Sequence, residues 1–260
     1  MIQNFAIGDL MIDCADAERA CAFYANLMDW EKTVAFDCPA VKTDNGMTIL
    51  FAETDIPYVP PVWPEESGKQ QKQMHLDFTV NDLPSAVNEA IRLGATKAAE
   101  QYNEGHCVTM LDTEGHPFCL GQWQGNLEYY EKKGYGVIPN ISINIDCQKQ
   151  KTLRNFYAQL TNWDKDFHPA ALISDNKMIV CYQGCDKDAT MDKYIPPVWP
   201  EEPGKQQKQM HFIHQVDDLR FAMDKAICLG ATKAAKQYGS GHFVAMLDTE
   251  GHPFCLYARI

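Results

Sequence analysis

A histidine and an aspartate two positions apart, His75 and Asp77, are the residues whose types and spacing suit acid–base chemistry most directly. They alternate with Met74, Leu76 and Phe78, which is the period-two pattern of a strand with one buried face. Both polar side chains should therefore project from the opposite face. A carboxylate beside an imidazole allows the histidine to act as a general base on a carbon acid. The alternative is a histidine that only forms structural hydrogen bonds.

The stretch that contains this pair occurs twice, at an offset of 136 residues. PPVWPEESGKQQKQMH returns as PPVWPEEPGKQQKQMH, and residues 60–120 and 196–256 are identical at 44 of 61 positions. In the second copy His211 takes the place of His75, but Ile213 replaces Asp77. The chain is an internal duplication, and its first copy is the better candidate for catalysis.

The elements that must position these residues follow one order throughout. After the strand of the first copy, Asp82 is suited to cap a helix and Gly94 to end it. Short strands joined by turns follow the helices, with Asn45-Gly46 as one hairpin signal. Each half therefore contains two β-α-β-β-β units, which predicts an α+β fold.

Four motifs occur in a characteristic order: a helix ending in FY-x-x-L-x-x-W at 23–30, a PP-x-WP loop, MHLDFTVNDL at 74–83 and LDTEGHPFCL at 111–120. Together they resemble the glyoxalase-like branch of the vicinal oxygen chelate superfamily, which includes glyoxalase I, extradiol dioxygenases and bleomycin-resistance proteins. The resemblance covers nearly the whole chain, twice. Because the chemistries of the superfamily are diverse, it implies the fold far better than the reaction.

The resemblance implies two tandem glyoxalase-like domains, residues 1–126 and residues 138–260, joined by a linker at 127–137. Each domain would consist of two βαβββ modules. We expect the mixed β-sheet of each domain to curve around a cavity for a small molecule.

Enzymes of the superfamily typically hold a divalent metal with one side chain from the first and one from the last strand of each module. Carried onto this sequence, that pattern implies a set in the N-terminal domain formed by Asp9, Glu53, His75 and Cys119. Carboxylate, imidazole and thiolate are accepted ligands of divalent metals, here Zn, Ni, Mn or Fe. The sequence itself requires no cofactor, and the alternative for Cys119 is the packing of a buried thiol.

The C-terminal domain offers a weaker set at the matching places, namely Ser142, Gly184, His211 and Cys255. The unshifted alignment puts Phe51 and Tyr182 at these last-strand positions, and Glu53 and Gly184 stand there if the alignment is shifted by two residues. In either alignment the second domain has too few metal-binding side chains. Any metal is therefore expected in the N-terminal domain.

The PPVWPEE segments resemble the superfamily's loop over the cavity. Trp63 and Trp199 are then placed to stack on a flat ligand, and we expect them to contact ligand together with His211. The alternative is that each tryptophan only fastens its loop to the core. Because Asp77 becomes Ile213, we expect the two cavities to bind different ligands, or one ligand with unequal strength.

Composition excludes several classes of partner. A formal charge of -12 opposes binding to nucleic acid or to an anionic membrane. With no secretion signal, no spanning apolar run and no CxxC pair, we expect a cytoplasmic protein with reduced cysteines. The expected partners are a small organic ligand and the packing of one domain on the other, with a homodimer left open.

Two classes of function remain. The first is a glyoxalase-like enzyme with lyase or isomerase chemistry on a small carbonyl or enolisable substrate in the N-terminal domain. The second is a non-catalytic protein that binds or sequesters a small ligand, of the bleomycin-resistance type. GxSxG, Walker A, GxGxxG and HExxH motifs are absent from the sequence, which gives no support to hydrolase, nucleotide-binding or zincin functions.

Overall fold

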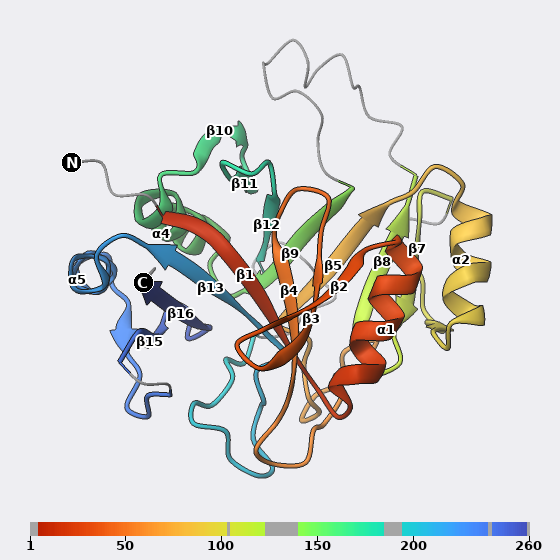
Figure 1. The fold of residues 1–260 in the computed structure, drawn as a ribbon, viewed down its shortest axis with the longest axis horizontal. Helices are drawn as coiled ribbons and strands as arrows, with labels where there is room; N and C mark the ends of the chain where they lie inside the picture. The colour runs from red at the N-terminus through yellow and green to blue at the C-terminus, as the bar shows by residue number, and fades with distance from the viewer. Residues whose placement is uncertain (1–4, 103–104, 123–139, 185–193, 239–240, 259–260) are drawn as a thin grey trace.

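The computed structural model describes residues 5–102, 105–122, 140–184, 194–238 and 241–258, and these form four modules with the same order of elements (Figure 1). Module 1 contains β1 (Phe5–Cys14), α1 (Ala17–Met28), β2 (Glu31–Ala35), β3 (Cys38–Lys42) and β4 (Thr48–Glu53), and module 2 contains β5 (Met74–Thr79), α2 (Leu83–Arg92), β6 (Thr96–Lys97), β7 (Cys107–Leu111) and β8 (Pro117–Gly121). Module 3 contains β9 (Ile141–Cys147), α4 (Gln150–Thr161), β10 (Asp164–His168), β11 (Ala171–Ile173) and β12 (Ile179–Gly184), and module 4 contains β13 (Met210–Val216), α5 (Leu219–Cys228), β14 (Thr232–Lys233), β15 (Phe243–Leu247) and β16 (Pro253–Ala258). The predicted α+β class and the βαβββ modules are confirmed.

Local sequence signals explain where the helices begin and end. The carboxylates of Asp16 and Asp82 accept hydrogen bonds from backbone N–H groups three residues further on, which satisfies donors that the first helical turn leaves free. Helix α2 stops just before Gly94, whose φ of +107° is a conformation that a side chain would strain. These boundaries agree with those expected from the sequence.

The modules combine into two eight-stranded mixed sheets. We expected the two modules of each half to share one sheet, but each sheet combines modules from different halves. Sheet A joins module 1 to module 4, in the order β14-β15-β16-β13-β1-β4-β3-β2. Sheet B joins module 2 to module 3, in the order β10-β11-β12-β9-β5-β8-β7-β6. The antiparallel pairs β1/β13 and β5/β9 lie at the centres of the two sheets. Each sheet therefore takes one module from each half of the chain.

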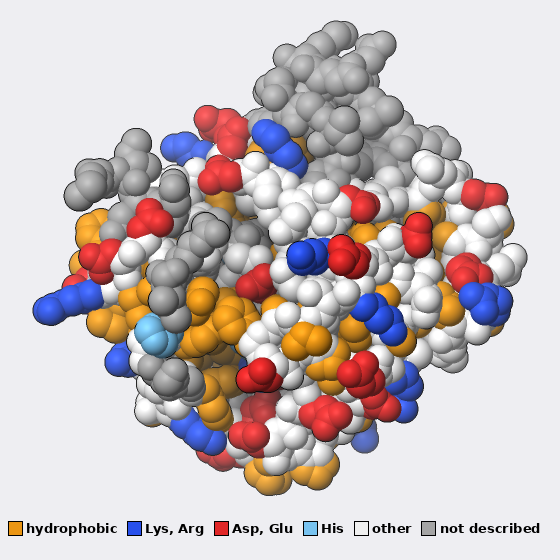
Figure 2. Space-filling model, viewed as in Figure 1, with side chains coloured by type: hydrophobic (Ala, Val, Ile, Leu, Met, Phe, Trp, Pro, Cys, Tyr) orange, Lys and Arg blue, Asp and Glu red, His pale blue; other side chains and the backbone are white. Residues whose placement is uncertain are grey.

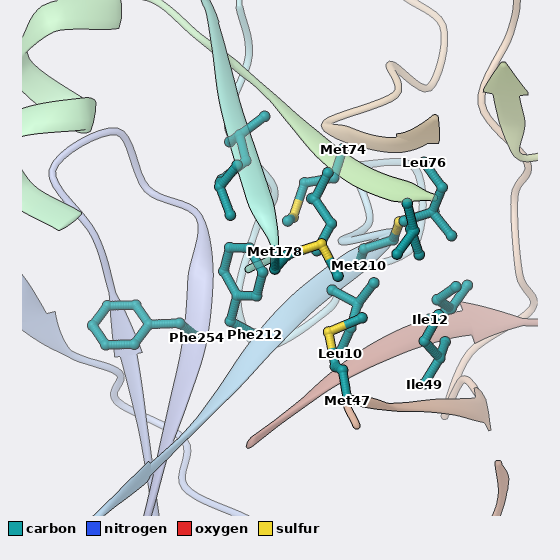
Figure 3. Packing of buried hydrophobic residues seen from close by; sticks show 14 of the residues in the cluster. Leu10, Ile12, Met47, Ile49, Met74, Leu76, Met178, Met210, Phe212 and Phe254 are labelled. Carbon is teal, nitrogen blue, oxygen red and sulfur yellow. The ribbon is translucent and has the colours of Figure 1, made fainter. Parts of the chain in front are cut away.

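One hydrophobic core lies between the two sheets (Figure 3). Leu10 and Ile12 of sheet A meet Met74 and Leu76 of sheet B there, and the inner faces of the helices contribute to the same cluster. We call this side of each sheet the core face and the opposite side the cavity face. Because side chains alternate along a strand, the residues between these core positions face the cavities.

Modules 1 and 2 contact each other outside the sheets, through the turn that precedes β8. Glu114 of this turn accepts hydrogen bonds from the N–H groups of Ala15 and Asp16 at the start of α1, and from the Arg19 side chain. Asp112 accepts a hydrogen bond of 2.8 Å from the Tyr24 hydroxyl. These contacts hold α1 beside α2 at one end of the molecule, whereas α4 and α5 lie at the other end (Figure 1).

Acidic side chains are spread over the face shown in Figure 2, and lysines and arginines lie among them rather than in one basic patch. Among the described helices, none combines the length and the apolar character that a membrane span requires. The predicted linker at 127–137 lies outside the described residues, so the domain boundaries stay a prediction.

The exchange of modules predicts how the N-terminal half behaves alone. Residues 1–126 contain β1 and β5 but neither β13 nor β9, so the central edges of both sheets would be exposed. We expect this fragment to associate as a dimer in which each copy supplies the missing module, or to remain unfolded. Light scattering after size exclusion, with circular dichroism, distinguishes these states. A cooperatively folded monomer would contradict the exchange.

Candidate functional site

A cavity of about 740 Å³ opens on the cavity face of sheet B. Its lining draws on both modules of the sheet and on the PPVWPEE loop that precedes module 2. The lining residues that bear on its chemistry are Trp63, Lys72, His75, Asp77, Cys107, Thr109, Cys119, Ser142 and Gln183. The cavity is therefore built by both halves of the chain, and several polar side chains lie on its floor.

Imidazole, carboxylate and thiol meet on this floor. His75 Nε2 lies 3.4 Å from Asp77 Oδ1, and a ligand atom of each of His75, Asp77 and Cys119 lies within 4.8 Å of the others. The strand register explains the convergence, because Asp77 of β5 is directly beside Cys119 of β8 and His75 is two residues along the same face. The predicted pairing of His75 with Asp77 is thus present in the structure.

Module 3 completes the cluster from the opposite side. Asn144 of β9 donates a hydrogen bond of 2.7 Å to Asp77 Oδ2, and Gln183 of β12 donates one of 3.1 Å to Asn144 Oδ1. Burial would raise the pKa of Asp77, but the adjacent His75 and the hydrogen bonds from its neighbours hold that pKa below its ordinary value. Asp77 is therefore an ionised carboxylate held in a fixed orientation.

The thiol of Cys119 is protonated in this environment. Its sulfur lies 3.7 Å from Thr109 Oγ1, and its hydrogen bond with Cys107, followed by burial, raises its pKa. The same hydrogen bond lowers the pKa of Cys107. Cys119 would have to lose its proton to bind a metal, so metal affinity at this floor should rise with pH.

A tryptophan and a buried lysine form the wall beside the floor. The Lys72 ammonium contacts the Asp146 carboxylate of β9 and lies 5.1 Å from the centre of the Trp63 ring. Trp63 packs edge-on against Tyr102 at 5.3 Å, and its indole N–H is buried without a hydrogen-bond acceptor among the described residues. This wall places a flat aromatic surface and an unused donor next to the cluster.

The four residues predicted as a metal set do not come together. His75 and Cys119 lie in sheet B, whereas Asp9 and Glu53 lie in sheet A, because their modules belong to different sheets. Asp9 is opposite Ile213, and burial raises its pKa, while Glu53 is exposed at the end of β4. The alternative positions Phe51 and Tyr182 are buried in the core. The candidate cluster is therefore His75, Asp77 and Cys119.

Sequence comparison places this architecture in a known family. The profile of the glyoxalase-like domain matches residues 9–121 and again residues 142–257. The chain belongs to the glyoxalase-like family. No curated protein matches it significantly. The two segments that match the glyoxalase-like family correspond to the two halves of the chain. Each sheet nevertheless takes one module from each half.

Solved structures support the fold of this family member over its full length. Glyoxalase I from Zea mays superposes with a TM-score of 0.60 at 11% identity, covering 98% of this chain and 93% of the other. A putative dioxygenase from Bacillus subtilis superposes with a TM-score of 0.53 at 10% identity, covering 98% and 86%. At such low identity the likeness concerns the fold alone.

The second cavity of the glyoxalase-like fold, about 350 Å³, lies on the cavity face of sheet A. It is lined by the predicted ligand-binding residues Trp199 and His211 and by Ile213, while Trp63 lines the first cavity. Burial, followed by the nearby Lys208 ammonium, lowers the pKa of His211 to about 3. His211 is therefore a neutral side chain beside an apolar one, where sheet B has His75 beside a carboxylate.

Sequence reasoning missed several residues of the sheet B site, among them Lys72, Asn144 and Gln183. Their only sequence signal is that Asn144 occupies a polar position between apolar neighbours in the strand of module 3. The histidines of the repeated DTEGH turns, His116 and His252, are buried and bonded to Asp112 and Asp248. They have structural roles and lie outside the lining of either cavity.

The depressed pKa of His211 predicts a pH dependence of stability. In the unfolded chain this histidine binds a proton below about pH 6.5, whereas the folded chain resists protonation until about pH 3. The contribution of His211 to the free energy of unfolding is thus complete above pH 6.5. Below that pH, the free energy of unfolding should fall by up to about 1.4 kcal/mol per pH unit. Lys208, paired with Asp13 and Glu201, is the charged group beside it.

Urea denaturation at pH 6.5, 5.5 and 4.5 measures this effect. The variant His211→Leu should lose this part of the pH dependence, while other titrating groups act equally in both proteins. The same pH dependence in wild type and variant would show that His211 is not buried in its neutral form.

Proposed function

We propose that the sheet B cavity binds a small organic molecule with a carbonyl group and catalyses lyase or isomerase chemistry that begins with loss of a proton beside that carbonyl. The observation that carries this proposal is the meeting of His75, Asp77 and Cys119 on a polar floor. The same place in sheet A has Ile213 instead of the carboxylate. The chemistry is thus assigned to one of the two cavities.

The residues of the floor divide the work of such a reaction. His75 and Asp77, 3.4 Å apart, form the proton-accepting pair, because an ionised carboxylate stabilises the imidazolium that forms when a histidine takes a proton. Asn144 and Gln183 hold the carboxylate in place. The indole N–H of Trp63 is available to donate a hydrogen bond to a carbonyl oxygen of the ligand. The indole ring can stack on a flat ligand.

We further propose that this floor accepts a divalent metal. The donors fit a Zn²⁺-like ion, since imidazole nitrogen, carboxylate oxygen and thiolate sulfur are its usual protein ligands. Asp77 Oδ1 is buried and lies 3.4 Å from His75 Nε2, and a ligand atom of each of His75, Asp77 and Cys119 lies within 4.8 Å of the others, close enough to hold one ion. His75, Asp77 and Cys119 would hold the ion, which would polarise the carbonyl of a bound substrate as a Lewis acid. Bound to the ion, His75 would no longer accept a proton, so the metal-bound floor is an alternative to the proton-accepting pair.

A second candidate function is binding or sequestering without catalysis, as in bleomycin-resistance proteins. It is favoured by Cys119 and Cys255, which stand where the superfamily's enzymes have a last-strand carboxylate. We also propose a cytoplasmic location, consistent with the free thiols of the nine described cysteines, and keep the domain boundaries at 1–126 and 138–260 as proposals.

Metal binding can be tested with Co²⁺, whose thiolate complexes have a near-ultraviolet charge-transfer band. We expect one equivalent to give this band in wild type and the matched variant Cys255→Ser, but not in Cys119→Ser. Replacing a direct ligand in His75→Gln should weaken affinity by more than the roughly 10–100-fold typical of an outer-shell residue. A band that survives Cys119→Ser and disappears in Cys255→Ser would assign the metal to the other cavity.

The catalytic role can be tested by deuterium exchange. Incubation of small 2-hydroxy ketones and 2-oxo acids in D₂O, followed by ¹H NMR, should show loss of the proton next to the carbonyl with the wild-type protein. His75→Gln and Asp77→Ile should slow this by about 10²–10⁴-fold, the usual contribution of general base catalysis. The matched variant His211→Gln should retain the wild-type rate. Equal rates in His75→Gln and His211→Gln would leave sequestration as the function.

A further inference from the structure

The walls of the sheet A cavity include four aromatic side chains, Phe36, Trp199, Tyr238 and Phe243. Trp199 and Tyr238 meet edge-on, with ring centres 5.1 Å apart. Phe36 and Phe243 meet edge-on at 5.0 Å, and both rings also pack on Tyr257. Phe36 and Tyr238 are 40% and 38% exposed, so these rings are accessible rather than buried in the core.

The floor between these walls is apolar apart from one histidine. Ile213, Ala245 and Cys255 line it where sheet B has Asp77, Thr109 and Cys119. His211 is only 4% exposed, and its Nδ1 is buried without a hydrogen-bond partner among the described residues. An unpartnered polar atom on an otherwise apolar floor is a position that a ligand can satisfy.

The charged residues of this cavity favour a cation over an anion. The Lys208 ammonium is already in contact with both Asp13 and Glu201, the latter at 3.2 Å, and lies 5.1 Å from the centre of the Trp199 ring. Glu53 and Asp55 add two more carboxylates to the lining. Lys236 lies 4.6 Å from the centre of the Tyr238 ring and 3.9 Å from Asp55, and it offsets that carboxylate only weakly because both side chains are at least half exposed. An anion would thus meet a lysine that is already neutralised and an excess of acidic groups.

We propose that the sheet A cavity is a second binding site, distinct from the sheet B site, and that it takes a small aromatic molecule with a positive charge. Aromatic faces attract cations, most strongly where water is excluded, and the carboxylates of the lining add to that attraction. The uncharged ring of the ligand would lie on the floor of Ile213 and Ala245. A cavity of about 350 Å³ suits a molecule with one or two rings.

Calorimetric titration of the full chain with benzyltrimethylammonium tests this proposal. We expect one site in wild type, with affinity at least tenfold lower in Trp199→Leu, since a desolvated cation–π contact contributes about that factor. The matched variant Trp63→Leu in the other cavity should bind like wild type. Phenylacetate, an anion of similar size, should give no measurable heat at the same concentrations.

A second variant keeps the test decisive if Trp199→Leu fails to fold. Phe243→Cys introduces the residue that this chain has at the matching position, Cys107, and should also weaken binding. The proposal is overturned if phenylacetate binds more tightly, if affinity is unchanged in both variants, or if Trp63→Leu abolishes binding. The variant His75→Gln should bind the cation like wild type, so failure of the sheet B chemistry does not affect this result.

Discussion

Two buried lysines hold the four modules in their arrangement. Lys72 precedes β5 and contacts Asp146 of β9, and Lys208 precedes β13 and contacts Asp13 of β1, so each ammonium joins the two modules of one sheet. A buried charge that loses its partner costs about 3–5 kcal/mol. A pairing of modules that separated either lysine from its carboxylate would therefore be strongly disfavoured.

Glutamines next to these lysines connect the two sheets to each other. Gln70 donates to the Gln207 carbonyl and accepts from the Gln207 N–H, and Gln206 makes a matching pair of contacts with Lys69 and Gln71. These bonds cross between the two copies of the GKQQKQ segment. These hydrogen bonds account for the near-identity of the two copies, because each copy must pair with the other copy as well as pack in its own module.

The same scaffold then carries two different cavities. Each has a tryptophan over a paired lysine, Trp63 over Lys72 and Trp199 over Lys208, at the same distance of 5.1 Å. The floors differ, since the ionised Asp77 of sheet B corresponds to Ile213 of sheet A. Modules 1 and 3, which come from the less similar parts of the two halves, make the floors differ further. Asn144 of module 3 lies beside His75 in sheet B, whereas Met11 of module 1 lies beside His211 in sheet A. Duplication has thus preserved the supporting contacts and changed the surface offered to ligands.

The sequence by itself determined the modules and the face of each strand. Alternation along β5 fixed which residues share a face, so the pairing of His75 with Asp77 could be predicted from neighbouring positions alone. The sheet partner of each module could not be predicted in this way, because all four modules present similar apolar core faces and similar strand edges. Only the tertiary structure, through long-range contacts such as Lys72 with Asp146, separated Asp9 and Glu53 from His75 and brought Asn144 to Asp77 instead. Strand periodicity is a local property of the backbone, whereas the choice of sheet partner depends on groups far apart in sequence that become neighbours only after folding.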